Sequence, residues 1–95
     1  MNTGLMKNLE KYLNQYSIDL EFWYGDIMET HETVAVRRFL GDNMPAMTSD
    51  MRDRLAALDE QAKSILNGYH GEETWDVKML RQVVALANNN QRQAA

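Results

Sequence analysis

Residues 29–32 hold the side chains best suited to acid–base chemistry. His31 lies beside Glu32 and two positions after Glu29, so one imidazole and two carboxylates fall within about one turn of a helix. Such a set can exchange protons in a pocket between helices, which makes His31, Glu29 and Glu32 a candidate polar site. An enzyme, or an accessory subunit of one, is therefore one hypothesis for function. The more frequent role of a histidine on an apolar helical stripe is a buried, hydrogen-bonded one.

The same segment does not complete a known metal or nucleophile motif. A zinc-protease helix needs a second histidine four residues after the first, and position 35 is Ala35. Asp26, Glu29 and Glu32 recur one turn apart and would suit a hard cation, but a solvated acidic face is the simpler explanation. The chain has no cysteine, no phosphate-binding loop and no serine-hydrolase turn. We therefore assign no catalytic residue, no metal and no cofactor.

Three adjacent aromatic residues, Phe22, Trp23 and Tyr24, stand in an acidic segment. Successive side chains of a helix point about 100° apart, so one apolar stripe cannot hide all three. Either the segment packs on two sides, or one ring is left for a partner chain, or the segment is not helical. Tryptophan and tyrosine are frequent anchors of protein interfaces. We predict that Phe22, Trp23 and Tyr24 form part of a partner-binding surface.

Methionine is frequent in this chain, with seven residues, and Met44 and Met47 flank the only proline, Pro45. Unbranched, polarizable side chains fill irregular gaps in cores, and they also suit adaptable binding surfaces. Because a loop offers little core to such side chains, Met44 and Met47 are predicted to join the partner-binding surface.

The net charge of −4 is placed unevenly along the 95 residues. Residues 1–33 carry two lysines and six acids, whereas residues 34–95 carry eight basic and eight acidic side chains. An acidic first third repels polyanions, so nucleic-acid binding is disfavoured. A helix-turn-helix outline from Ala62 through Gly68 into the last helix keeps a nucleic-acid-binding regulator as an alternative. The adjacent Arg37 and Arg38 are expected to pair with acids such as Asp42.

The spacing of apolar residues predicts an all-α fold. From a cap at Thr3, apolar residues recur every three or four positions up to a possible break at Ser17. Residues 18–40 fit either a strand-like alternation or one or two helices, and we favour helix, with Thr30 or Thr33 as a second cap. Residues 42–48 are read as a connector.

The second half of the chain gives clearer helical boundaries. Thr48 or Ser49 caps a helix that stops at Asn67-Gly68. A last helix is predicted from Glu72 or Thr74 to Asn88. It carries two apolar stripes, Trp75, Met79, Val83, Leu86 and Val77, Leu80, Val84, Ala87.

Together these features predict a bundle of four or five helices, with the last helix central or at a dimer interface. Residues 1–88 are expected to form one helical domain and residues 89–95 a frayed tail. The start of the chain lacks the apolar run of a signal peptide, and no segment is long and apolar enough to span a membrane, so a cytoplasmic protein is expected.

The leading hypothesis for function is a small interaction or regulatory protein. It would present an aromatic and methionine-lined acidic surface to itself, as a homodimer, or to another protein. The physical motive is an excess of apolar side chains, which one copy of a chain of this size cannot easily bury.

Overall fold

Four α-helices and one short 3-10 helix make up the part of the chain that the computed structural model describes, which is the backbone of residues 3–94 and the side chains of residues 4–85. The helices are α1 (Thr3–Glu21), α2 (Ile27–Asp42), η1 (Met44–Ala46), α3 (Ser49–Asn67) and α4 (Trp75–Ala94). No strand occurs within residues 3–94, and the predicted all-α bundle is confirmed. None of the described helices combines the length and apolarity needed to cross a lipid bilayer.

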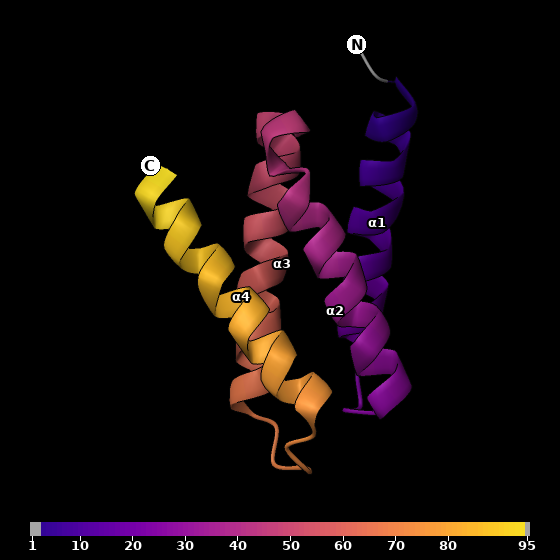
Figure 1. Ribbon diagram of the computed structural model, residues 1–95, viewed down its shortest axis with the longest axis vertical. Helices are drawn as coiled ribbons and strands as arrows, with labels where there is room; N and C mark the ends of the chain where they lie inside the picture. Colours follow the sequence, from indigo (N-terminus) through magenta and orange to yellow (C-terminus); the bar gives the residue numbers. More distant parts are fainter. Residues whose placement is uncertain (1–2, 95) are drawn as a thin grey trace.

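The four long helices alternate in direction, and Figure 1 shows α1 and α3 running down the bundle and α2 and α4 running up it. Helix α2 packs against α1 and α4, and α3 packs against the same two helices. The connection from α2 to α3 therefore crosses the bundle diagonally. Helix α4 is a corner helix rather than a central one, and its last turns lie apart from the other helices (Figure 1). Its place at a dimer interface stays a prediction.

The core takes one face from each long helix, as the apolar periodicity requires. In the described part of α4, Val77, Leu80 and Val84 of one predicted stripe are buried, and Met79 and Val83 of the other are half-buried against the core. Trp75, from the other stripe, is 68% exposed. The remaining buried apolar residues are Leu9, Leu13, Tyr16, Leu20, Val34, Val36, Leu40, Met47, Met51, Leu55, Leu58, Ala62 and Leu66.

The aromatic triplet lies where the helix breaks. Helix α1 does not stop at Ser17 but continues to Glu21, and residues 23–26 are not helical. The carboxylate of Asp26 then caps α2 by accepting a hydrogen bond of 2.8 Å from the backbone N–H of Met28. Of the three explanations for the triplet, the structure supports the non-helical one.

The boundaries of the second half follow local capping signals. The hydroxyl of Thr48 accepts a 3.2 Å bond from the N–H of Met51, and α3 ends before Gly68, as predicted. The hydroxyl of Thr74 accepts a 3.3 Å bond from the N–H of Val77 at the start of α4. The backbone of α4 continues past the expected end at Asn88 to Ala94. The side chains of the predicted tail, and those of Leu86 and Ala87, lie outside the described residues.

A charged network crosses the centre of the bundle. Arg37 of α2 donates from Nε and Nη2 to the two carboxylate oxygens of Asp59 on α3, over 2.8 and 2.9 Å. The hydroxyl of Tyr16 on α1 donates to the same carboxylate over 2.8 Å. Arg37 and Asp59 are 1% and 0% exposed, and Arg37 pairs with an acid as expected, although that acid is Asp59 on α3 rather than Asp42. Three helices are thereby held in register by one polar cluster.

Candidate functional site

Large apolar side chains are exposed to solvent at the end of the bundle where α1 passes into α2. Five large apolar side chains are exposed there, with Phe22 at 54% and Tyr24 at 78%. Helix α3 packs against α1, and α4 packs against α2, and neither covers these side chains within the described residues. We call this set the apolar corner, and its members are Ile18, Phe22, Tyr24, Ile27 and Met28.

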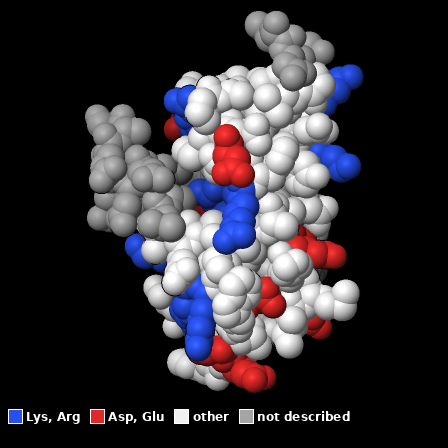
Figure 2. All heavy atoms as spheres, viewed as in Figure 1, with Lys and Arg blue, Asp and Glu red and all other residues white. Residues whose placement is uncertain are grey.

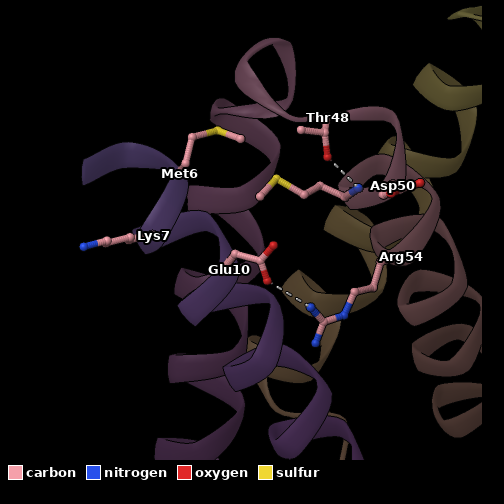
Figure 3. A pocket seen from close by; sticks show the side chains of 7 residues that line it. Met6, Lys7, Glu10, Thr48, Asp50 and Arg54 are labelled. Atoms are coloured by element: carbon pink, nitrogen blue, oxygen red, sulfur yellow. Dashed lines mark hydrogen bonds and ion pairs between the residues drawn. The ribbon is translucent and has the colours of Figure 1, made fainter. Parts of the chain in front are cut away.

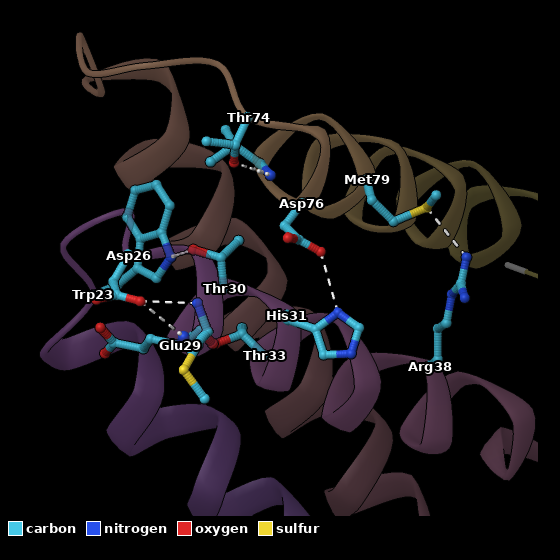
Figure 4. Close-up of polar contacts among 12 residues, drawn as sticks. Trp23, Asp26, Glu29, Thr30, His31, Thr33, Arg38, Thr74, Asp76 and Met79 are labelled. Atoms are coloured by element: carbon cyan, nitrogen blue, oxygen red, sulfur yellow. Dashed lines mark hydrogen bonds and ion pairs between the residues drawn. The ribbon is translucent and has the colours of Figure 1, made fainter.

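Trp23, the middle residue of the triplet, packs against other residues of the same chain. Its ring packs against the ring of Tyr69, with centroids 4.9 Å apart and a tilt of 59°. Its indole N–H donates to the hydroxyl of Thr30 over 2.9 Å, as Figure 4 shows. Trp23 is half-buried, and both its ring and its polar atom already have partners. Of the predicted triplet, only Phe22 and Tyr24 are free to meet a partner chain.

Tyr69 ties the two connections at this end of the bundle together. Its ring lies so close to Gly25 and Gly71 that a Cβ on either glycine would overlap it. At Gly25 the nearest ring atom would be 2.7 Å away, and the φ angle of +84° also favours glycine. The hydroxyl of Tyr69 donates to the carbonyl of Glu72 over 2.9 Å. The loop that carries Tyr24 is therefore held in one conformation rather than left free.

The end of the bundle that carries the apolar corner is strongly acidic. Residues 12–36 and 64–77, which form this end, contain eight Asp or Glu residues and no Lys or Arg, a formal charge of −8. The other residues contain ten Lys or Arg and six acids, a formal charge of +4. In Figure 2 the lower right of the visible face, where α2 begins, shows white and red spheres only. Within residues 4–85, all six exposed large apolar side chains, including Trp75, belong to the acidic end.

Two carboxyl groups at this end have pKa values above the ordinary range. Burial, followed by the charge of Glu32, raises the pKa of Asp19, and one of its carboxylate oxygens is buried without a hydrogen bond. Burial and the neighbouring charges of Asp19, Asp26 and Glu32 raise the pKa of Glu29. Burial first, and neighbouring carboxylates second, therefore disfavour the charged forms of both groups.

The predicted polar site does not assemble around its carboxylates. The side chain of His31 is 72% exposed, so the expectation of a buried histidine is wrong. Its Nδ1 lies 3.2 Å from the carboxylate of Asp76 on α4, and Figure 4 shows this pair joining the two helices. Glu29 and Glu32 do not share that contact. Among the described residues, no group of three or more His, Cys, Asp or Glu side chains is placed to hold a metal ion.

The two methionines of the connector, Met44 and Met47, pack into or against the core. Met47 is 6% exposed and belongs to the core, so the expectation that a loop offers it little core is wrong. Met44 is half-buried and packs against the same core. Arg52 of α3 donates to the backbone carbonyls of Met44 and Pro45, which holds the short helix η1 against α3. Neither methionine lies near the apolar corner, because the connector is at the other end of α2.

An open cavity of about 500 Å³ lies between α1 and α3, away from the acidic end (Figure 3). Its charged residues are of both signs, and Arg54 forms an ion pair of 3.5 Å with Glu10. None of the predicted site residues lines it, and its charges are partly paired with one another. The lining residues are Met6, Lys7, Glu10, Thr48, Asp50, Met51 and Arg54.

No protein-family model matches this chain, and no curated protein or solved structure matches it either. The geometry alone therefore points to the candidate site. Sequence reasoning found Phe22 and Tyr24 but missed Ile18, Ile27 and Met28. The available signal was their closeness to the triplet: Ile18 is one turn before Phe22, and the other two directly follow the cap at Asp26.

Proposed function

We propose that this chain is a protein-interaction module, acting in assembly or regulation, that binds another protein surface through the apolar corner. The observation that carries the proposal is the exposure of five large apolar side chains where α1 passes into α2, with Tyr24 and Met28 the most exposed. Large exposed apolar patches mark interaction sites on small proteins. Aromatic and methionine side chains are also the types enriched at interface centres.

The rigidity of the corner supports the same proposal. Gly25, Trp23 and Tyr69 fix the loop between α1 and α2 through ring packing and backbone geometry. A preformed surface loses little conformational entropy when it binds, so more of its contact energy appears as affinity.

The alternatives have weaker support in the geometry. Arg81, one of the basic residues of the helix-turn-helix outline, is engaged by Glu73 through two hydrogen bonds of 2.6 and 3.2 Å. An acidic counterpart of this kind reduces its attraction for phosphate. The enzyme hypothesis depended on His31 with Glu29 and Glu32, and His31 instead contacts Asp76 at an exposed position.

The double variant Phe22→Ser/Tyr24→Ser tests the proposal. Both side chains are exposed, so we expect the variant to remain folded by circular dichroism, with little change in stability. Self-association is measured by sedimentation velocity at micromolar concentration, and partner complexes are measured by recovery on tagged protein. If the wild type self-associates, we expect the variant to be monomeric. If the wild type recovers partner proteins, we expect the variant not to recover them.

A matched control changes two exposed residues of α3, Glu60→Ser and Gln61→Ser, which lie outside the apolar corner. We expect this control to behave like the wild type in both measurements. A wild type that is a sharp monomer, and that yields the same recovered complexes as Phe22→Ser/Tyr24→Ser, would contradict the proposal.

A further inference from the structure

We infer that the partner of the apolar corner is an amphipathic helical segment of another protein, with Lys or Arg side chains flanking its apolar face. The inference rests on the proposed function and adds the chemistry of the partner. It is carried by the coincidence of two features in one place: every exposed large apolar side chain of the described residues belongs to the end of the bundle that has eight acids and no Lys or Arg.

Electrostatics favours a basic partner over a second copy of this chain. A symmetric dimer joins the same patch of both subunits, so it would bring one end of formal charge −8 against another of the same sign. Like charges placed together at an interface oppose association, whereas opposite charges accelerate it and fix the orientation of the partners. The pKa values of Asp19 and Glu29, already raised by burial and by neighbouring carboxylates, reflect the same local excess of negative charge.

The nearest cations do not neutralise this end. Arg81 is committed to Glu73 through both of its hydrogen bonds, and Lys78 lies on α4, where it acts on the same carboxylate. The α1–α2 side, which carries Asp19, Asp26 and Glu29, has no Lys or Arg between residues 12 and 36. This stretch of the chain therefore supplies no Lys or Arg of its own to these carboxylates, and a basic partner would supply them.

The fold also limits the form of the partner. Residues 3–94 contain no strand, so they offer no sheet edge to which an extended peptide could add. The exposed residues instead project from the last turns of α1, the loop and the first turn of α2. Amphipathic helices bind other proteins through apolar side chains spaced three or four residues apart, and basic residues flanking such a face would meet the acids around the apolar corner.

Three synthetic helical peptides of about 18 residues test the inference. They share one leucine face and differ in the flanking residues, which are Lys in the basic peptide, Gln in the neutral one and Glu in the acidic one. Fluorescence anisotropy measures their binding to the full chain. We expect the basic peptide to bind at least about tenfold more tightly than the neutral one, and this advantage to shrink at about 500 mM salt.

Two pairs of variants locate the effect. Glu21→Gln/Glu32→Gln removes two charges from the acidic end, and Asp53→Asn/Glu60→Gln removes two exposed charges from α3. We expect the first pair to weaken binding of the basic peptide several-fold and the second to leave it nearly unchanged. The variant Phe22→Ser/Tyr24→Ser should abolish binding of both the basic and the neutral peptide.

The outcomes separate the inference from the proposed function. Equal binding of basic and neutral peptides, lost in Phe22→Ser/Tyr24→Ser, would overturn the inference and leave the interaction module standing. A dimer that depends on Phe22 and Tyr24, without binding of any peptide, would do the same and make a second copy the occupant. Binding of the basic peptide that survives Phe22→Ser/Tyr24→Ser would place it elsewhere and overturn the inference. Absence of peptide binding, of self-association and of any recovered complex that depends on Phe22 and Tyr24 would contradict the two together.

Discussion

Two regions of this bundle depart from the ordinary distribution of polar and apolar side chains, in opposite directions. At the centre, Arg37 and Asp59 place a charged pair in the core, and Tyr16 completes their hydrogen bonds. At one end, the apolar corner places large apolar side chains such as Tyr24 in contact with solvent. Either feature alone would attract a functional interpretation.

The difference between the two regions is whether the chain itself supplies the missing partners. Both carboxylate oxygens of Asp59 accept hydrogen bonds from within the bundle, so the central network needs nothing from outside. The side chains of the apolar corner stay exposed, and the two cations at the start of α4, Lys78 and Arg81, act on Glu73 rather than on the acids of α1 and α2. We therefore assign a structural role to the network and a binding role to the corner.

The largest expected effect comes from separating the buried charges. Arg37→Met leaves the carboxylate of Asp59 buried with only the hydroxyl of Tyr16, and such unpaired charges cost about 3–5 kcal/mol. The double variant Arg37→Met/Asp59→Leu should lose less stability than either single variant, because no charge is left buried. Urea unfolding followed by circular dichroism measures this coupling. Additive losses in the double variant would show that the two groups are not energetically linked.

The next effect concerns the support of the apolar corner. Gly25→Ala should lower the free energy of unfolding by about 1–2 kcal/mol from the left-handed backbone alone, and by more because the new Cβ meets the ring of Tyr69. Gly68→Ala is the matched control, since its Cβ would meet only atoms 3.7 Å away. Thermal unfolding compares the two. Equal melting temperatures for these variants would mean that Tyr69 does not clamp the loop.

A smaller effect returns to the central network and depends on pH. Burial, the charge of Asp59 and the hydrogen bond to Asp59 raise the pKa of Tyr16 above its ordinary value of 10.0. The folded chain therefore keeps this proton where the unfolded chain loses it. The free energy of unfolding should fall above about pH 10, by up to about 1.4 kcal/mol per pH unit. Tyr16→Phe should lose about 1–2 kcal/mol at neutral pH and show a shallower fall in alkali, and an unchanged slope would contradict this.

The smallest expected effect concerns how much the charge of Glu29, at the acidic end, destabilises the folded chain. Because the pKa of Glu29 is raised, first by burial and then by Asp19, Asp26 and Glu32, its charged form is disfavoured in the folded chain at pH 7. This cost disappears as pH falls through the raised pKa. Glu29→Gln should therefore increase stability slightly at neutral pH and low salt, and the gain should vanish near pH 4 or in high salt.

Urea unfolding at the two pH values measures this difference, with Glu60→Gln on α3 as the control. A loss of stability in Glu29→Gln at neutral pH would show that the carboxylate is held favourably. The charge of Glu29 would then not destabilise the folded chain, and a basic partner would have no such destabilisation to remove.

Features that depend on neighbours along the chain were predictable from the sequence. Thr48 and Gly68 marked both ends of α3, because caps and stops act on backbone groups within a few residues. The triplet Phe22, Trp23 and Tyr24 was recognisable as a conflict with helical packing for the same reason. The break after α1 was predicted at Ser17, whereas the chain turns at Gly25 and starts α2 at the Asp26 cap. Local sequence signals alone do not distinguish these two places.

Features that depend on distant residues were not predictable. Arg37 lies 22 positions from Asp59 and Tyr16 lies 43 positions from it, and nothing local links these three. The side chain of His31 contacts Asp76, 45 positions away, rather than Glu29 or Glu32 beside it. The burial of Met47 and the exposure of Trp75 likewise depend on which faces the helices present to one another.

The sequence by itself therefore determined that this chain forms helices, where two of them begin or end, and that its aromatic segment resists simple burial. Only the tertiary structure decided which aromatic residue is used by the fold, which charges are neutralised internally, and which apolar side chains remain uncovered. The physical reason is that helical periodicity and capping act over one or two turns, whereas burial and charge pairing arise from contacts between helices that the chain brings together only on folding.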